Sequence, residues 1–395
     1  MRKTFLWSIL AISFIILLAD SCKLNSTGNE SDISVNDSIE LANLEAREDS
    51  VELAKALAEH SLFEIKVTAD LETEPVQSGE DEDAADDPAI WYNSAAPSSS
   101  LVLGTDKNAG IYVYDLEGHI VQFREVGRIN NVDLRDGFEF QGKKVVLVAG
   151  SNRSNNSITL FYIDPDTRLL SESIVHIPST VDEVYGICLY HNPIEDEYHV
   201  FVNGKGGKLE QWLITADNHN LHGELIRSIM LSSQPEGMVA DDQLGMLYLG
   251  VEMEGIYRLN AHSGGDATPV KIPGSDEGNP NIAYDIEGLA IFSYQGTDYL
   301  IASSQGNFSY ALFRLGSNEE YLTSFIIAEG SVDGVEETDG LEVIAKPLNS
   351  RFSQGMMVVQ DGFNTDGNEA TSQNFKYVSF DKIVKIIKAR LNEPE

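Results

Sequence analysis

The sequence predicts an all-β protein, a six-bladed β-propeller closed by an N-terminal strand. Two observations carry this prediction. Glycine and other turn residues recur between short runs of Val, Ile, Leu and Tyr, as in chains of short antiparallel strands. In addition, six segments share one pattern, an apolar strand, a turn, a second apolar strand and an alternating third strand, at nearly regular spacing. Units of this kind and length are typical of propeller blades.

The first 22 residues have the pattern of an export signal. Two basic residues precede an apolar stretch over residues 5–18, and small residues lead to Cys22. The run LADSC resembles a lipoprotein signal box, although Asp20 departs from the usual small residue. We expect a signal peptide of lipoprotein type; a plain signal peptide and an uncleaved anchor stay open. The protein is expected to be an exported outer-membrane or cell-surface lipoprotein, or periplasmic or secreted if Cys22 is not lipidated.

Residues 23–61 are predicted to form a tether that is partly disordered and partly helical. Its first part is rich in Ser, Asn, Asp and Glu, a composition that cannot repay the entropy of ordering. Residues 37–60 contain good helix formers with a loosely apolar side, so a helix is expected there. The propeller is expected over residues 62–390, and no long helical periodicity is recognised after Leu62.

The six units can be aligned on one position beside the first apolar strand. The differences between successive aligned residue numbers lie between 46 and 52. The aligned residues are Asp87, Asp133, Tyr185, Glu236, Glu287 and Asp339. The sixth unit runs out near Phe380 with one strand missing, whereas residues 63–70 alternate like a strand but belong to no unit. We therefore expect this N-terminal strand to complete the last blade and close the ring.

Five of the six aligned residues are acidic, and the sixth is Tyr185. The first strand of each blade lines the channel of a propeller, so these side chains converge on one face. One such acid before a strand is commonly turn chemistry, but five in register repel one another by roughly 4 kcal/mol per pair at 4 Å. Oxygen ligands without His or Cys suit Ca²⁺. The sequence therefore predicts a cluster of several calcium ions.

Basic residues follow the second strand of several units, where they can overhang the same face. They are Lys107, Arg153, Lys205 and Lys208, together with Arg128 in the neighbouring run GRINNVD. Arg binds phosphate through two donors, and Lys acts as a point charge. Bases at matching places beside a predicted metal cluster indicate a substrate that carries phosphate.

The excess of acidic over basic residues limits which partners the protein is expected to bind. Acidic residues outnumber basic ones 63 to 27, for a formal net charge of −36, which would repel nucleic acid. There are two cysteines and no disulfide framework; Cys188 lies in an apolar run and is expected to act as a small hydrophobic residue. We expect a small-molecule substrate, no nucleic acid, contact with a membrane only through the lipid anchor, and a monomer whose closed ring hides its strand edges.

Ten short motifs occur in order over residues 65–380. They are AADDPAIW from Ala84, NNVD from Asn130, SNRS from Ser151, DEVYG from Asp182, EGMVADD from Glu236, DIEGL from Asp285, SSQGN from Ser303, TDG from Thr338, QDG from Gln360 and QNFK from Gln373. In this order they closely resemble the motifs of the β-propeller phytases, also called alkaline phytases. The resemblance implies a six-bladed, calcium-dependent 3-phytase that releases phosphate from myo-inositol hexakisphosphate and prefers its calcium complex.

The resemblance also implies roles for individual residues. Calcium ligands, direct or in an outer shell, would be Glu72, Asp86, Asp87, Tyr185, Glu236, Asp285, Glu287, Asp333, Asp339, Asp361 and Asn364. Phosphate would be held by Lys107, Arg153 and Lys205, with Glu252 near a second phosphate position. Where the family often has a second base and an acid, this chain has Asn108 and Gly206. These two departures concern phosphate affinity and positional preference.

The expected mechanism is in-line attack of a metal-activated water on phosphorus, without a covalent intermediate. Glu236, Asp339 and Tyr185 are the catalytic candidates, and the two acids are expected to take protons. A phosphocysteine route needs Cys and Arg in one tight loop, which Cys188 lacks. None of the eight His residues lies beside Arg in a phosphate-binding run, which excludes a phosphohistidine route.

Two other functions stay open at this point. One is a six-bladed calcium-dependent lactonase or esterase, whose site would need one ion and few bases. The other is a propeller without catalytic activity, whose acidic face docks a cationic partner. The basic loop residues argue against the first, and phosphate release from phytate with and without calcium separates all three.

Overall fold

The computed structural model describes residues 35–79, 83–217, 219–367 and 369–392. The predicted signal peptide, Cys22 and the start of the tether lie outside these residues. The chain divides into two compact units, residues 1–61 and residues 62–395. Among the described helices, none is both long and apolar enough to span a membrane.

The described part of the first unit, from residue 35 onward, is the helix α2 (Val35–Leu62). The helix predicted over residues 37–60 is therefore confirmed. Its sequence contains neither glycine nor proline, so nothing interrupts the backbone hydrogen bonds over its 28 residues. Val51 is 70% exposed, and Lys55 pairs with Glu59 one turn later at 3.9 Å.

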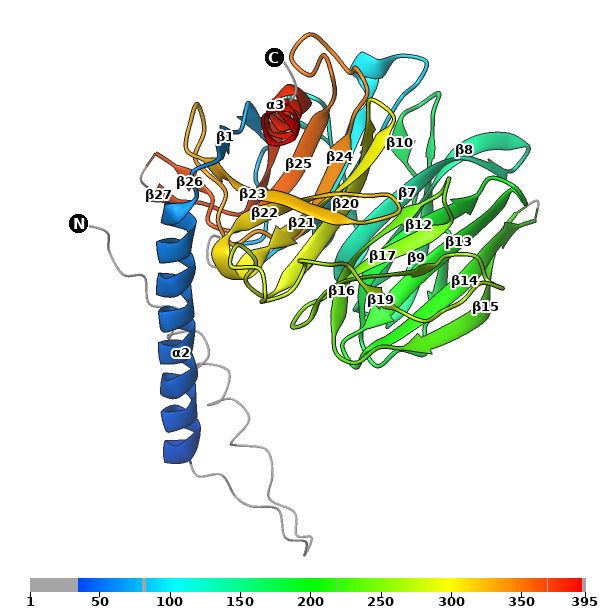
Figure 1. Ribbon diagram of the computed structural model, residues 1–395. Helices are drawn as coiled ribbons and strands as arrows, with labels where there is room; N and C mark the ends of the chain where they lie inside the picture. The colour runs from blue at the N-terminus through cyan, green and yellow to red at the C-terminus, as the bar shows by residue number, and fades with distance from the viewer. Residues whose placement is uncertain (1–34, 80–82, 218, 368, 393–395) are drawn as a thin grey trace, which may run out of the picture. The chain divides into compact units, whose positions relative to one another are not determined.

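Six sheets of four or five strands form the blades of the second unit (Figure 1). The first three contain β3 (Ala85–Trp91), β4 (Leu101–Asp106), β5 (Gly110–Tyr114) and β6 (Ile120–Glu125); β7 (Ile129–Phe140), β8 (Lys143–Asn152), β9 (Ser157–Asp164), β10 (Leu169–Leu170) and β11 (Val175–Pro178); and β12 (Val184–Asn192), β13 (Glu197–Gly204), β14 (Lys208–Ala216) and β15 (Leu221–Met230).

Two of the other three blades, the fifth and the sixth, include a strand from the N-terminal segment. The three blades contain β16 (Pro235–Asp241), β17 (Met246–Val251), β18 (Gly255–Asn260) and β19 (Val270–Lys271); β20 (Ile286–Tyr294), β21 (Thr297–Ser304), β22 (Ser309–Arg314), β23 (Glu320–Ala328) and β1 (Lys66–Thr68); and β24 (Leu341–Ile344), β25 (Met356–Asp361), β28 (Asn374–Ser379) and β2 (Leu71–Glu72). A small ribbon, β26 (Thr365–Asp366) with β27 (Glu369–Ala370), and two short 3₁₀ turns complete the unit.

The first strands of the blades form a closed ring. Strand β3 lies against β7, and the contacts continue through β12, β16, β20 and β24 back to β3. Buried apolar side chains fill the spaces between neighbouring blades; Leu103 of β4 and Val148 of β8, for example, belong to one cluster. The six-bladed propeller predicted from the repeat is therefore confirmed.

Closure of the ring by the N-terminal segment is also confirmed, but its pairing differs from the prediction. Strand β1 adds a fifth strand to the fifth blade, parallel to β23, whereas β2 completes the sixth blade, antiparallel to β28. Asp70 lies between the two strands. Its carboxylate accepts hydrogen bonds from the Ser379 amide (2.7 Å) and from the Lys382 ammonium (2.9 Å), which ties down the bend between the blades.

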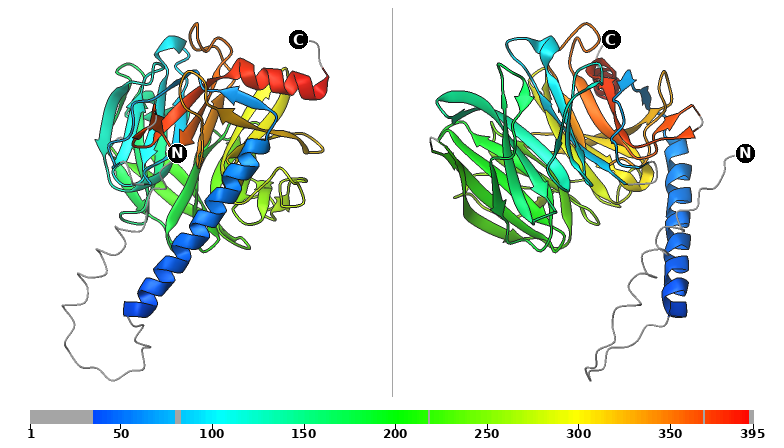
Figure 2. Two further views of the ribbon diagram at one scale, coloured as in Figure 1. Left: turned by 90° about the vertical axis from the view of Figure 1, so that its left-hand side faces the viewer. Right: turned by 180° about the vertical axis from the view of Figure 1, so that it is seen from behind.

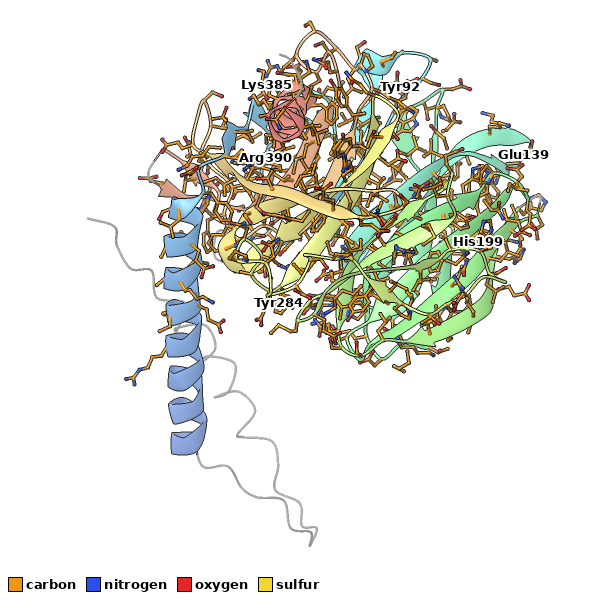
Figure 3. The ribbon with its side chains drawn as sticks, in the orientation of Figure 1. Tyr92, Glu139, His199, Tyr284, Lys385 and Arg390 are labelled. Carbon is orange, nitrogen blue, oxygen red and sulfur yellow. The ribbon has the colours of Figure 1, made fainter. Side chains whose placement is uncertain are left out.

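A second helix, α3 (Phe380–Leu391), follows the last strand, and the expectation of no helix after Leu62 is wrong here. Phe380, Ile383 and Ile387 recur at intervals of three and four and are buried in the core of the last two blades. Lys385 and Arg390 lie on its exposed side (Figure 3). The helix lies near β1, with which it lines a small pocket (Figure 2).

Candidate active site

Each of the first five channel strands carries a register shift where it begins. In β16, for example, the pairing with β17 passes from Pro235 directly to Met238, so Glu236 and the residue after it are left out of the ladder. Such a bulge turns a side chain away from the plane of the sheet and is common beside functional sites. The bulged pairs are Asp86–Asp87, Asn130–Asn131, Tyr185–Gly186, Glu236–Gly237 and Glu287–Gly288.

These bulges correct the alignment of the repeat. The residues equivalent to Glu236 are Asp86 and Asn130 in the first two blades, so the predicted register was wrong at Asp87 and Asp133. The Asp87 carboxylate accepts a hydrogen bond from the Val132 amide at 3.0 Å. Asp133 is paired with Arg135 at 3.0 Å. Asp86, which the sequence also predicted as a metal ligand, occupies the bulge position, and the metal role of Asp87 stays a prediction.

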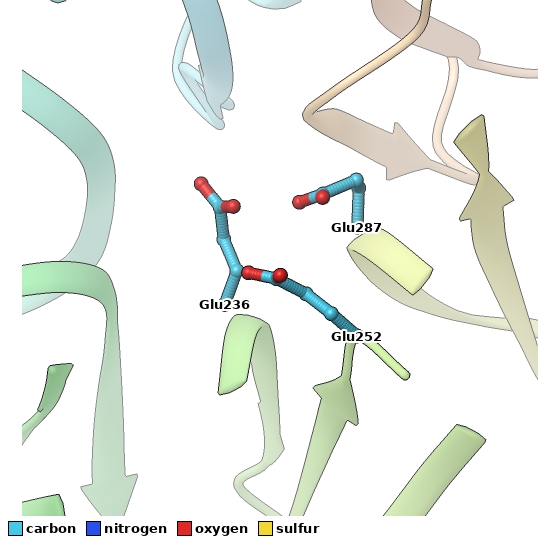
Figure 4. A group of neighbouring side chains, drawn as sticks. All are labelled: Glu236, Glu252 and Glu287. Carbon is cyan, nitrogen blue, oxygen red and sulfur yellow. The ribbon is translucent and has the colours of Figure 1, made fainter. Parts of the chain in front are cut away.

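The bulged residues gather into a central cluster of acids. Carboxylate oxygens of Glu236, Glu252 and Glu287 lie within 4.8 Å of one another, and all three side chains are buried (Figure 4). The charges of Glu236 and Glu287 both raise the pKa of the Tyr185 hydroxyl, after burial, which is the largest cause. Asp285, which precedes the fifth channel strand, contributes to the raised pKa of Glu252. The fourth and fifth blades therefore supply one region of negative charge, which lies beside Tyr185 of the third blade.

Residues of the first and last blades, and Asp83 just before the first blade, add three more acids and a lysine. The Nζ of Lys107 lies 2.8 Å from a carboxylate oxygen of Asp83, 3.2 Å from Asp86 and 3.4 Å from Asp339. Gln305 donates a further hydrogen bond to Asp339. Lys107 was predicted to bind phosphate, and the structure shares its charge among three carboxylates.

Other predicted phosphate ligands gather around the ring of Tyr185. The Lys205 ammonium lies 4.6 Å from the centre of the Tyr185 ring, and the Arg153 guanidinium lies 5.9 Å from it. The Arg153 amide donates to the carbonyl of Arg128 at 2.7 Å, which places these two residues next to each other. Glu183, which sequence reasoning did not assign, accepts two hydrogen bonds from Arg153. The result is a group of bases beside Tyr185, in which Glu183 is paired with Arg153.

Four predicted metal ligands form a second cluster, on the sixth blade. Glu72, Asp333, Asp361 and Asn364 surround the ammonium group of Lys376, which is fully buried. The Nζ lies 2.9 Å from the Asn364 oxygen and 3.2 Å from Asp361, and it also donates to Glu72 and Asp333. The motif QNFK contains this lysine, but the sequence did not reveal that it would supply a cation here.

Burial raises the pKa of carboxyl groups in both clusters. It raises the pKa of Asp86 to about 7, although Lys107 opposes the shift, and it raises the pKa of Glu252 to about 7 as well. The pKa values of Glu287 and Asp339 lie well above their usual range, chiefly through burial and then through neighbouring carboxylates. Burial also raises the pKa of Asp361 to about 7, against the effect of Lys376.

The central cluster fits a hard divalent cation. Its ligand atoms are carboxylate and phenol oxygens from several blades, which is the donor set that Ca²⁺ prefers. The Oδ1 atom of Asp86 is buried and has no hydrogen-bond partner among the described residues. Since a buried acceptor without a partner is unfavourable, this atom fits a bound cation. Lys107 alone cannot neutralise the surrounding acids.

Two comparisons with known proteins identify the family. The chain matches the Phytase family over residues 34–393. It is 39% identical over 328 residues to the 3-phytase of Bacillus subtilis (strain 168), covering 81% of this chain and 85% of that protein.

Similar solved structures are more distant. A protein from Lactobacillus plantarum has a TM-score of 0.44 at 14% identity, over 74% of this chain and 87% of its own. The Cps50 (Swd1) β-propeller domain of Myceliophteria thermophila has a TM-score of 0.41 at 14% identity, over 71% and 80%. These likenesses are too weak to carry an argument. The family match and the Bacillus relative are sufficient, and the chain belongs to the β-propeller phytase family of phosphoric monoester hydrolases.

Proposed function

We propose that this protein is a calcium-dependent 3-phytase, which releases phosphate from myo-inositol hexakisphosphate bound as a calcium complex. The observation that carries the proposal is the central cluster, in which acids from several blades border bases from three loops. A substrate with many negative charges needs cations beside it, and the cluster needs cations for itself. Metal ions between the acids and the phosphates meet both needs.

Different residues bind the metal and the phosphate in this proposal. We propose that calcium is held by Asp86, Asp87, Tyr185, Glu236, Asp285, Glu287 and Asp339, and that Glu72, Asp333, Asp361 and Asn364 are ligands beside Lys376. Arg153 presents a guanidinium to a phosphate, assisted by Lys205 and Arg128, because its fork of donors matches phosphate oxygens. Calcium, when bound, supplies a Lewis acid that activates water and neutralises phosphate oxygens.

Proton transfer is assigned to the same carboxylates. Glu236 and Asp339 are proposed to accept protons released at the reacting centre, with Tyr185 beside them. Glu252 borders Glu236, and a carboxyl whose pKa is near 7 can hold or release a proton at neutral pH. No side chain is required to bond covalently to phosphorus.

The proposal is tested by measuring phosphate release from phytate. After removal of metal with a chelator, the protein should release no phosphate above the buffer blank, and addition of calcium should restore release. Lactone and carboxylic ester substrates serve as controls and should not be hydrolysed. If the calcium-loaded protein released no phosphate, the phytase proposal would fail. Ester or lactone cleavage alone would favour a hydrolase of another type.

The raised pKa values predict how stability depends on pH without metal. Asp86 and Glu252 stay protonated to about pH 7 in the folded state but ionise near pH 4 when unfolded. The folded state therefore holds more protons, and the stability of the metal-free protein should fall as the pH rises from about 4 to about 7. Thermal unfolding in chelator should show a lower midpoint at pH 8 than at pH 5.5.

Calcium should reverse this trend. Because the ion binds ionised carboxylates, it should raise the unfolding midpoint more at pH 8 than at pH 5.5. Midpoints in chelator that are equal at the two pH values, or higher at pH 8, would contradict the protonation assigned to the cluster.

Location and assembly are proposed from the sequence. The protein would be exported and held at a membrane by lipid on Cys22, and it would be monomeric. Incorporation of labelled fatty acid that persists in Cys22→Ser would exclude this anchor.

A further inference from the structure

Asn130 differs in kind from its equivalents in the other blades. It occupies the bulge position that holds Asp86, Tyr185, Glu236 and Glu287 in the neighbouring blades. Its side chain is fully buried, so its amide must find all its partners inside the protein. The other bulge positions hold acids and a phenol. An amide differs from them because it donates through its nitrogen and accepts through its oxygen without carrying a charge.

The Asn130 amide joins two charged groups of opposite sign. Its Oδ1 accepts a hydrogen bond from Arg153 Nη1 at 3.1 Å. Its Nδ2 donates to Glu236 Oε1 at 2.9 Å and to Asn131 Oδ1 at 2.9 Å. A guanidinium only donates and an ionised carboxylate only accepts, so these partners permit one orientation of the amide. Both amide hydrogens and the oxygen are thereby used.

The Arg153 guanidinium also forms hydrogen bonds with Glu183. Its Nε donates to Glu183 Oε1 at 2.9 Å, and its Nη2 donates to the same oxygen. The guanidinium is thus held between a half-exposed acid and the buried Asn130. The partners of Glu183 are bases, since it accepts hydrogen bonds from Arg153 and lies near the charges of Lys205 and Arg128, whereas Asn130 contacts both Arg153 and the acid Glu236.

We propose that Asn130 is a positioning residue that couples the phosphate-binding Arg153 to the metal-binding Glu236. The inference rests on the function proposed above for these two side chains. An aspartate would place an oxygen against the Glu236 carboxylate, and a lysine would meet the Arg153 guanidinium, so either charge would break one half of the connection. The amide holds the base and the acid at a fixed separation and orients both.

This connection makes calcium binding and phosphate binding depend on each other through one side chain. When Glu236 is oriented by a metal ion, Asn130 is oriented with it and presents its oxygen to Arg153. By reciprocity, a phosphate that orders Arg153 favours the metal-binding position of Glu236. Loss of the amide should weaken both binding events, whereas loss of Glu183 should weaken phosphate binding alone.

The test uses two probes on the full-length protein. Calcium is titrated calorimetrically into the metal-free protein, and myo-inositol hexasulfate, which is not a phosphate ester, is titrated into the calcium-loaded protein. Asn130→Ala should weaken binding of both probes by roughly ten- to a hundredfold, since it removes hydrogen bonds to two charged groups. Glu183→Gln should weaken only the hexasulfate. The KM for phytate should follow the hexasulfate affinity.

A matched control separates positioning from general stability. Asn192 is also a buried asparagine in a channel strand. Its Nδ2 donates a hydrogen bond to Glu195, and its Oδ1 accepts one from the Ile194 amide. Asn192→Ala should bind both probes as the wild type does. Asn130→Ser, which is too short to reach both partners, replaces the alanine variant if that variant does not fold.

The outcomes are decisive in both directions. The inference is overturned if Asn130→Ala weakens only one probe, if it resembles Asn192→Ala, or if the wild type binds neither probe. A wild type that binds both probes but releases no phosphate from phytate would refute the proposed function, while the coupling through Asn130 would still be judged by the two titrations.

Discussion

Replacing Glu236 with glutamine should lower phytate hydrolysis by roughly 10²- to 10³-fold, the range seen when one group that stabilises charge in a reaction is removed. Glu236 lies at the centre of the site, where it borders Glu252 and Glu287 and accepts a hydrogen bond from Asn130. Glutamine keeps the size of the side chain but removes the charge. Phosphate release at saturating calcium measures the effect.

The same substitution should make the metal-free protein more stable at pH 8. It removes one negative charge from a group of buried acids that repel one another. A site built for a bound cation gains stability from such a change, whereas a structural acid loses it. Glu139→Gln, on the exposed side of β7, serves as the control and should change neither activity nor stability. An E236Q variant that keeps a tenth or more of the activity would remove Glu236 from the catalytic candidates.

Replacing Lys376 with methionine should lower the free energy of unfolding by about 3–5 kcal/mol, the loss expected when one partner of a buried ionic network is removed. The ammonium is fully buried among Glu72, Asp333, Asp361 and Asn364. Methionine has a similar length but leaves three carboxylates without a counter-charge. Urea unfolding in the presence of chelator measures the change.

The control for this variant is Lys385→Met. Lys385 pairs with Asp381 one turn away on the exposed face of α3, a type of contact worth about 0.3–0.5 kcal/mol. Calcium added to the Lys376→Met protein should restore part of the lost stability, because the vacated oxygens are ligands that the ion accepts. Equal losses in the two variants would show that the buried network contributes no more than a surface pair.

The repeat made the ring and its acidic channel predictable, because equivalent strands follow one another at nearly constant spacing. The bulges were not predictable, since one extra residue in a strand leaves no mark in composition. This is why the repeat was aligned on Asp87 and Asp133, whereas Asp86 and Asn130 occupy the equivalent bulge positions. The acids at Glu236, Glu287 and Asp339 were placed correctly because a glycine follows each of them.

Two other features depended on contacts between distant parts of the chain. Lys376 lies in a mostly apolar strand, and nothing in the sequence around it indicates an ionic cluster. The acids that surround it come close only when the ring has folded. Strands β1 and β2 are too short for the sequence to show which blade each one joins. Helix α3, by contrast, could have been found from the spacing of Phe380, Ile383 and Ile387.

The pairing of β2 with β28 also has a consequence for the order of synthesis. Glu72 lies opposite Lys376 in this pairing, although the two are separated by 304 positions in the chain. A ribosome makes the closing strand first and its partner last, so the sixth blade stays open until almost the whole chain has emerged. The acid on that strand reaches its lysine only then. Completion of the ring and assembly of the second ionic cluster are therefore one late event, and nascent chains truncated before β28 should lack both.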